Sequence, residues 1–195
     1  MRLVLATHNP HKVDELRRIL GEAGVEPIPE LLSGRDVALP DVEETGATFA
    51  ENAMLKARAG FLATGLACVA DDSGLVVDAL DGEPGVRSAR YAGGHGDDEA
   101  NVRLVVERMR GAEDRRARFV CAAAVVAAEG EWVVEDTLEG NLADEPRGDR
   151  GFGYDPILVP HGDTRTCAEL TPEEKDAISH RGKAFRGLRP ILEAL

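Results

Sequence analysis

The sequence lacks the marks of a membrane, secreted or zinc-binding protein. No apolar run approaches the length of a membrane span, and no basic segment followed by an apolar one opens the chain. The three cysteines are far apart and form no CxxC pair. His8 and His11 lie three residues apart but have no third soft ligand nearby, which argues against zinc. We therefore expect a reduced, cytoplasmic protein without a membrane partner.

Positive charge is also scarce. The chain has 23 lysine and arginine residues against 36 aspartate and glutamate residues, which gives a formal net charge of −13. So acidic a chain is poorly suited to binding nucleic acid or an acidic membrane surface. Its overall field would also repel a polyphosphate. A ligand of that kind would therefore need basic side chains gathered in one place and a metal cation.

The length and the apolar pattern predict one α/β domain. The 195 residues, 43% of them hydrophobic, can form a single domain over 1–195 with room for two lobes. Strand-like runs alternate with helix-like segments early in the chain, and a hairpin follows, which predicts a mixed sheet flanked by helices. Two of the helices begin with a capping box. The expected strands are Arg2–Ala6, Leu66–Ala70, Leu75–Asp78, Phe119–Ala127 and Trp132–Thr137, with a hairpin turn at Glu129-Gly130, and the expected helices begin at Lys12, Thr48, Asp98, Pro172 and after His180.

The segment Thr7-His8-Asn9-Pro10-His11-Lys12 stands where the first strand gives way to the first helix. Backbone N–H groups and the positive end of a helix dipole favour anions at such a turn, and Lys12 adds a full charge. Asn9 followed by Pro10 also fits an ordinary helix cap and first helical position, with no ligand. The segment is therefore either an anion site or a capped helix start.

Two adjacent carboxylates in Asp71-Asp72-Ser73-Gly74 follow an apolar strand. Mg²⁺ prefers one or two carboxylates together with water and phosphate oxygens, so this segment is a candidate cation site. The same residues are also common in turns, and a plain turn is the alternative. Neighbouring residues of a strand face opposite ways, so we expect the two aspartates to have different roles.

A second acidic segment, Glu43-Glu44, precedes a helix on which Asn52 and Lys56 share one face. By itself, the acidic pair fits a solvated loop or favourable charge near the first turn of the helix. Lys56 either points into a site or lies on the surface, as most lone lysines do.

Two segments near the end of the chain could hold the organic part of a ligand. The glycine-rich loop 148–156 carries Phe152 and Tyr154, although only 4% of the residues are aromatic, and it contains no phosphate-binding GxxxxGK[ST] motif. An aromatic ring can stack on a base, or it can fill the core. The second segment, 174–183, gathers Lys175, His180 and Arg181, which either bind a ligand or stabilise a helix end.

Together and in this order, the motifs resemble those of the inosine triphosphate pyrophosphatase family. The resemblance covers nearly the whole chain. It rests on the Ser/Thr-x-Asn-x-x-Lys pattern of Thr7–Lys12 and on the segments Glu43–Gly46, Asn52–Lys56, Asp71–Leu75, Phe152–Pro156 and Ser179–Gly182.

The resemblance implies a function and a fold. It implies Mg²⁺-dependent hydrolysis of 6-oxo purine nucleoside triphosphates, namely dITP, ITP and XTP, to the monophosphate and pyrophosphate, which removes deaminated purines from the nucleotide pool. It also implies an elongated α/β fold with two lobes around a substrate cleft, and a homodimer.

The resemblance also assigns roles by position. Asp72 would be the catalytic base, and Glu43 with Asp72 would bind the metal, although Glu44 is an equally placed alternative to Glu43. The substrate-binding residues implied are Thr7, His8, Asn9, Pro10, His11, Lys12, Lys56, Ser73, Phe152, Gly153, Tyr154, Asp155, Lys175, His180 and Arg181. Two rival functions remain: a pyrophosphatase for other bases, such as modified pyrimidines, and a nucleotide-binding regulator that does not hydrolyse.

Overall fold

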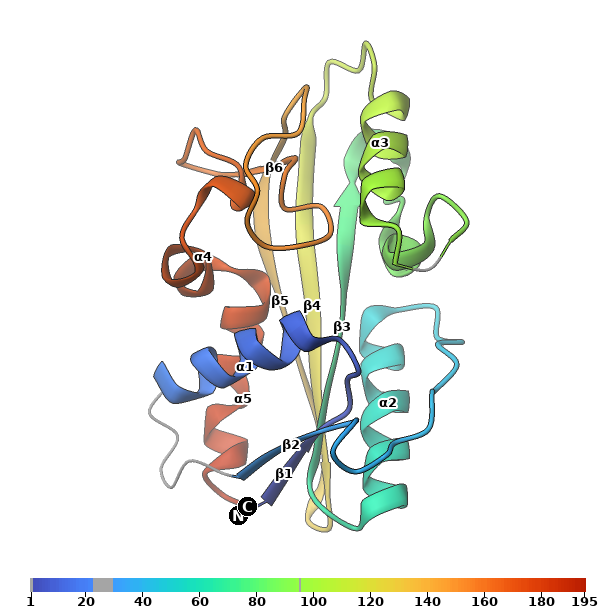
Figure 1. Cartoon of the computed structure of the whole chain (residues 1–195), viewed down its shortest axis with the longest axis vertical. Helices are drawn as coiled ribbons and strands as arrows, with labels where there is room; N and C mark the ends of the chain where they lie inside the picture. Colours follow the sequence, from blue (N-terminus) through green and yellow to red (C-terminus); the bar gives the residue numbers. More distant parts are fainter. Residues whose placement is uncertain (1, 23–29, 95) are drawn as a thin grey trace. The chain divides into compact units, whose positions relative to one another are not determined.

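Strands and helices alternate through the first half of the chain and give way to a long hairpin (Figure 1). The computed structural model describes residues 2–22, 30–94 and 96–195. In order, the elements are β1 (Arg2–Leu5), α1 (Pro10–Glu22), β2 (Glu30–Ser33), α2 (Phe49–Thr64), β3 (Cys68–Val77), α3 (Asp98–Arg108), β4 (Arg116–Ala127), β5 (Gly130–Leu142), β6 (Leu158–Pro160), α4 (Pro172–Ile178) and α5 (His180–Leu192), with 3₁₀ turns η1 (Asp78–Leu80), η2 (Gly85–Arg90) and η3 (Cys167–Glu169).

The strands form one mixed sheet in the order β2-β1-β3-β4-β5-β6. β1 runs parallel to β2 and to β3, whereas β5 and β6 are antiparallel. The prediction of a mixed α/β sheet is therefore confirmed. The chain divides into two compact units: the first comprises Met1–Asp72, Cys121–Asp136 and Arg181–Leu195, and the second comprises Ser73–Val120 and Thr137–His180.

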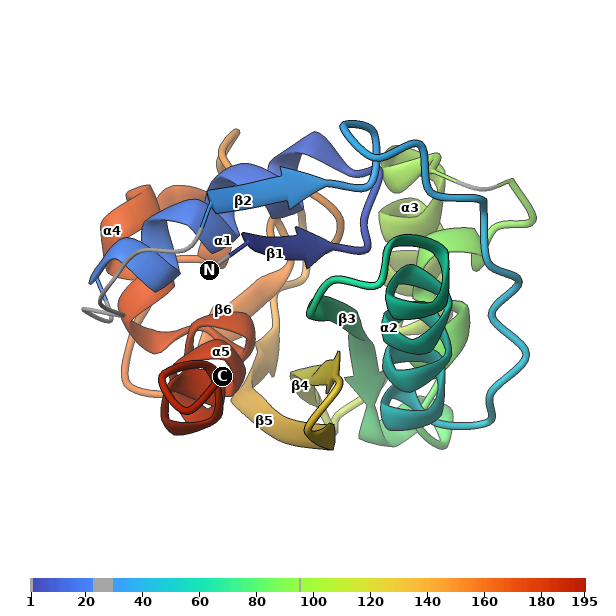
Figure 2. The ribbon, with the colours of Figure 1, turned by 90° about the horizontal axis from the view of Figure 1, so that it is seen from below.

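The first unit is organised by the two-residue period of β1. Leu3 and Leu5 pack with the apolar faces of α1 and α5 in one buried cluster. Val4 belongs to a different cluster, which includes Cys68 and Phe61. Alternate residues of one strand thus serve opposite faces. Figure 2 shows the result, with α2 on one side of β1 and β3 and α5 on the other.

The second unit has its own core. Leu75 and Val77 of β3 pack there with Val105 of α3, and Tyr154 and Ile157 join them from the segment before β6. The three cysteines are buried and unpaired thiols. None of the helices in the described part of the chain combines the length and the apolar character that crossing a membrane requires.

Most local predictions are confirmed, and one is wrong. Both capping boxes are present, at Thr48 and Thr171, and residues 128–129 connect β4 to β5 in a hairpin. The pair Asp71-Asp72, however, does not end a strand or form a turn, because β3 runs unbroken from Cys68 to Val77. β2 and β6 were not predicted, since strands of four and three residues carry too little pattern.

The strand continues through this polar segment because its backbone finds a hydrogen-bond partner in a distant part of the chain. The Leu75 N–H donates to Ser88 Oγ at 2.9 Å, and Ser88 Oγ donates to the Gly85 carbonyl at 2.6 Å. Gly74 permits this approach, because a Cβ there would lie only 2.3 Å from Ser88 Oγ. The turn propensity of the Asp-Asp-Ser-Gly sequence is thus overridden by the packing of η2.

Candidate active site

Asp71, in the middle of β3, is surrounded by basic side chains of the first unit. Lys12 Nζ, from the first turn of α1, lies 2.9 Å from Asp71 Oδ2. Arg181 Nε, from the first turn of α5, lies 3.3 Å from the same oxygen, and Arg181 Nη1 also pairs with Glu15 Oε2 of α1. These four residues, which we call the Asp71 cluster, contain two positive and two negative groups.

The Asp71 cluster is almost completely buried. The side chains of Arg181, Asp71 and Glu15 are 2%, 1% and 4% exposed. Burial alone would raise the pKa of Asp71, but Lys12 and Arg181 outweigh it and hold that pKa well below its usual range. Asp71 is therefore a permanent anion with a structural place between two cations.

Asp72 points to a different set of partners, also in the first unit. Asn52 Nδ2 of α2 donates to Asp72 Oδ2 at 3.1 Å, and Lys56 Nζ lies 3.5 Å from Asp72 Oδ1. Lys56 Nζ also donates to Glu44 Oε1 at 2.7 Å. We call these residues, Glu44, Asn52, Lys56 and Asp72, the Asp72 cluster. The prediction that the neighbouring aspartates face opposite ways is confirmed by these separate partners.

The Asp72 cluster carries an excess of negative charge. Burial raises the pKa of Asp72, and the nearby Glu44 carboxylate adds to the rise, whereas Lys56 opposes it. Burial would lower the pKa of Lys56, but the surrounding carboxylates, Asp72 first among them, outweigh it and raise that pKa. Lys56 is thus charged, and Asp72 and Glu44 share its ammonium.

The geometry bears on the choice between Glu43 and Glu44. Glu44 is the residue whose carboxylate reaches Lys56 and perturbs Asp72, whereas Glu43 is exposed. Across the ranges that the structure covers, no three His, Cys, Asp or Glu side chains gather as a metal cluster. Two carboxylates nevertheless suffice for Mg²⁺ when water and phosphate oxygens complete the shell. Asp72 and Glu44 fit this donor set.

The Thr7–Lys12 segment forms a helix cap, as one of its two interpretations predicted. The Asn9 side-chain oxygen accepts from the His11 N–H at 2.9 Å, and Thr7 Oγ1 accepts from the Asn9 N–H at 3.1 Å. α1 begins at Pro10, and His8 and His11 are exposed. The cap does not exclude an anion site, because Lys12 stands in the same first turn and an ammonium has three donors.

In the second unit, Asp155, Lys175 and Phe152 form a compact group. Lys175 Nζ lies 2.6 Å from Asp155 Oδ2 and 5.2 Å from the centroid of the Phe152 ring. Asp155 Oδ2 also accepts from the Phe152 N–H at 2.9 Å. Gly151 is required beside this group, since its φ is +75° and a Cβ would lie 2.0 Å from Asp155 Oδ2.

The remaining predicted residues of the second unit lie in or near its core. Tyr154 is buried, and its hydroxyl donates to the Ser88 carbonyl at 2.8 Å. The buried His180 ring lies 4.9 Å from the Phe119 ring, centroid to centroid. Gly153 and Ser73 are half-buried. Tyr154 thus anchors the glycine-rich loop, as the core-filling interpretation of its aromatic residues predicted.

Glu15 is a residue that the sequence analysis missed. It pairs with Arg181 inside the Asp71 cluster. The helical spacing could have revealed it, because Glu15 lies three residues after Lys12 and shares the buried side of α1 with Leu16 and Ile19. A carboxylate on the apolar face of a helix requires a partner.

Comparisons with known proteins identify the family. Residues 3–191 match the Ham1 family. The chain belongs to the Ham1 family. A Streptomyces coelicolor relative named dITP/XTP pyrophosphatase is 58% identical over 199 residues, covering 100% of this chain and 98% of the relative. A Mycobacterium tuberculosis relative of the same name is 52% identical over 196 residues, covering 100% and 96%.

Solved structures of Ham1 proteins share the fold. A HAM1 protein from Coxiella burnetii is 41% identical, with a TM-score of 0.89 and complete coverage of both chains. A nucleoside-triphosphatase and dITP/XTP pyrophosphatase from Mycobacterium abscessus is 53% identical, with a TM-score of 0.77, covering 97% of this chain and 100% of that one. The resemblance stated from the motifs is therefore confirmed at the level of the family.

Proposed function

We propose that this Ham1 protein is a dITP/XTP pyrophosphatase. It hydrolyses the anhydride bond between the α and β phosphates of 6-oxo purine nucleoside triphosphates, with Mg²⁺, and yields the monophosphate and pyrophosphate. The names of relatives that are 52–58% identical over the full chain support this activity. The structural observation that supports this activity is the pair of charged clusters around neighbouring residues of β3. The Asp71 cluster is neutral, and the Asp72 cluster is anionic.

The first step of the proposed mechanism is binding of the triphosphate by lysines. Lys12 stands in the first turn of α1, where backbone N–H groups favour anions, and Lys56 is largely buried beside Asp72. Their charges offset the strongly acidic field of the chain. Phosphoryl transfer depends mainly on such positioning and charge neutralisation, because the protein contributes little covalent chemistry.

Mg²⁺ would be held by Asp72 and Glu44, the two carboxylates of the Asp72 cluster. When bound, it would neutralise phosphate oxygens and lower the pKa of the attacking water. The raised pKa of Asp72 supports a cation at this place, because burial and Glu44 both disfavour its charge. We therefore propose Glu44, rather than Glu43, as the second ligand.

The hydrolytic step uses Asp72 as the base. An Asp72 carboxylate oxygen accepts a proton as the water oxygen attacks phosphorus, and the bridging P–O bond between the α and β phosphates breaks. Asn52 holds the other Asp72 oxygen in place through a 3.1 Å hydrogen bond. Asp71, bound between Lys12 and Arg181, orients the phosphate-binding lysine and takes no proton.

Base recognition is assigned mainly to residues of the second unit. The Phe152 ring offers a stacking surface, and the Lys175 ammonium, which pairs with Asp155, carries three N–H donors. A donor pairs with the 6-oxo group of hypoxanthine or xanthine but not with the 6-amino group of adenine. His180 and Arg181 are the other proposed contacts, and for Arg181 this role competes with its pairing to Asp71 and Glu15.

A substrate panel tests the function. Monophosphate and pyrophosphate are measured after incubation with dITP, XTP, ITP, ATP and a modified pyrimidine triphosphate, each with Mg²⁺ or with excess chelator. We expect products from the three 6-oxo purines with Mg²⁺ and none after chelation. Preference for the pyrimidine would favour the rival substrate class, and binding without products would favour a regulator.

Three further properties follow the same proposal. The net charge of −13 supports a small-molecule substrate rather than nucleic acid. A homodimer and a cytoplasmic location are the states we expect for an enzyme of the nucleotide pool. Sedimentation of the purified chain tests the first of these, because a dimer of about twice 20.9 kDa separates clearly from a monomer.

A further inference from the structure

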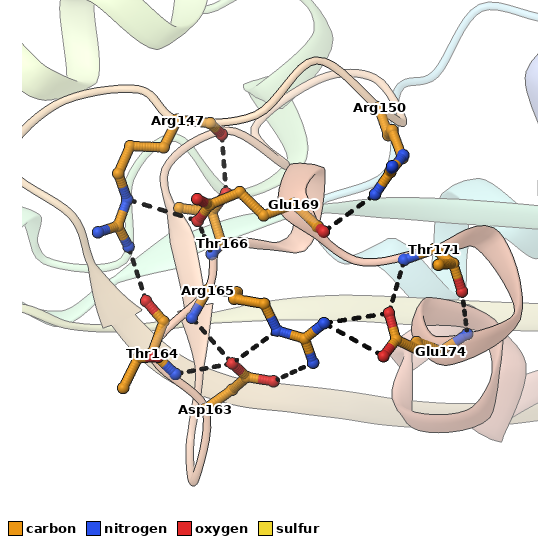
Figure 3. A network of polar contacts seen from close by, with 9 residues as sticks. All are labelled: Arg147, Arg150, Asp163, Thr164, Arg165, Thr166, Glu169, Thr171 and Glu174. Carbon is orange, nitrogen blue, oxygen red and sulfur yellow. Dashed lines mark hydrogen bonds and ion pairs between the residues drawn. The ribbon is translucent and has the colours of Figure 1, made fainter.

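The glycine-rich loop is held firmly at its two ends. Just before it, the Arg147 guanidinium donates to the Thr164 carbonyl at 2.9 Å, and near its start Arg150 donates to the Glu169 carbonyl at 3.1 Å (Figure 3). Near its end, the Tyr154 hydroxyl donates to the Ser88 carbonyl, and Asp155 accepts from the Lys175 ammonium. These contacts fix where the loop begins and ends.

The centre of the loop is held at Gly153 by a hydrogen bond rather than by side-chain packing. Gly151 and Gly153 have φ values of +75° and +60°, and a Cβ at Gly153 would meet no atom within 4 Å. On the side of α3, the loop lines a groove of about 460 Å³. Phe152, which offers the stacking surface, stands between these two glycines. Its position is therefore not determined by close packing around Gly153.

Two carboxylates accept hydrogen bonds from backbone N–H groups of this centre, Asp155 from Phe152 and Asp98 from Gly153. Asp98 Oδ2, in the first turn of α3, accepts a hydrogen bond from the Gly153 N–H at 2.7 Å. Asp98 is not needed to cap its helix, because Asp97 is the N-cap and accepts from the Ala100 N–H at 3.0 Å. The Asp98 carboxylate is thus available for a contact outside its own helix.

We propose that Asp98 is a positioning residue for base selection: through the Gly153 N–H it holds Phe152 against Lys175. The inference rests on the proposed function, in which Phe152 and Lys175 contact the base. A hydrogen bond to a carboxylate is stronger than one to a neutral acceptor. Its loss removes one of the backbone hydrogen bonds that hold Phe152 beside the Lys175 ammonium, which lies 5.2 Å from the ring centroid.

The test compares Asp98→Ala and Asp98→Asn with the control Glu99→Ala. Glu99 is a second acid in the first turn of α3, so its removal costs the same helix-dipole stabilisation without touching the loop. The first measurement is hydrogen exchange of the peptide 149–155. We expect faster exchange in Asp98→Ala, intermediate exchange in Asp98→Asn, whose amide oxygen still accepts, and no change in Glu99→Ala.

The second measurement is the ratio of kcat/KM for dITP to that for dATP. We expect Asp98→Ala to lower this ratio about fivefold, the effect of one hydrogen bond, with partial rescue in Asp98→Asn and no change in Glu99→Ala.

Unchanged exchange in Asp98→Ala, or a ratio equal to that of Glu99→Ala, would overturn the proposal. So would faster exchange throughout α3, which indicates a structural role. Wild-type protein inactive on dITP would instead refute the proposed function, and the exchange experiment would still test the contact.

Discussion

Replacing Arg181 by methionine should destabilise the fold strongly. The substitution keeps a long side chain but removes the charge, and it leaves Asp71 and Glu15 buried with Lys12 as their remaining cation in the cluster. The side chains of Arg181, Asp71 and Glu15 are 4% exposed or less. Asp71, Glu15 and Lys12 together would then carry a net negative charge in a medium of low dielectric.

The magnitude follows from burial. Removing one partner of a buried ion pair costs about 3–5 kcal/mol, because the other charge stays buried without compensation. For a chain of this size, roughly 2–4 °C is lost per kcal/mol, so we expect the melting temperature to fall by roughly 6–20 °C. The exposed pair Arg58–Glu131, with side chains 53% and 41% exposed, gives the control. Arg58→Ala should cost no more than about 1 kcal/mol.

A double-mutant cycle makes the test specific. Arg181→Met with Glu15→Gln leaves one cation, Lys12, and one anion, Asp71, so the charge balance is restored. Urea unfolding of the two single variants and the double variant should show a coupling of about 1–3 kcal/mol in favour of the double. A loss below about 1 kcal/mol in Arg181→Met, similar to Arg58→Ala, would refute the argument from buried charge.

The same variant tests the role that the sequence suggested for Arg181. If Arg181 reads the 6-oxo group, Arg181→Met lowers kcat/KM for ITP more than for ATP, because only ITP loses a bond. If its work is to hold Asp71, both nucleotides lose equally. Because Arg181→Met is expected to be less stable, the kinetics are measured at a temperature where the variant is folded.

Three further changes probe the chemistry. Asp72→Asn should lower turnover by about 10²–10⁴ with little loss of secondary structure by circular dichroism, since the amide keeps the shape but loses the basic oxygen; more than about a tenth of the wild-type rate would remove Asp72 from the base role. Lys12→Ala should raise KM for ITP and XTP to a similar degree, because its charge acts on the phosphates, and a loss confined to one base would contradict this. Glu44→Gln should raise the Mg²⁺ concentration needed for half-maximal rate, while Glu43→Gln should not, and the reverse order would assign the metal to Glu43.

Local patterns predicted several elements of the fold correctly. The capping boxes at Thr48 and Thr171 fixed two helix starts, because they need residues only three positions apart. The hairpin after β4 was equally local. The course of β3 through Asp71–Gly74 was not predictable. The Leu75 N–H there donates to Ser88 Oγ, which is distant in sequence, so no local pattern reveals this contact.

The sequence by itself determined which groups this protein has for its chemistry, and that Asp71 and Asp72 face opposite ways, because side chains alternate along a strand. Only the tertiary structure decided what each one meets. Arg181 and Asp71 are 110 residues apart in the chain, and Arg181 and Glu15 are 166 apart. Contacts at such separations depend on how α1 and α5 pack, which no local pattern specifies. In the same way, the tertiary structure brings Glu44, rather than Glu43, to Lys56 on α2.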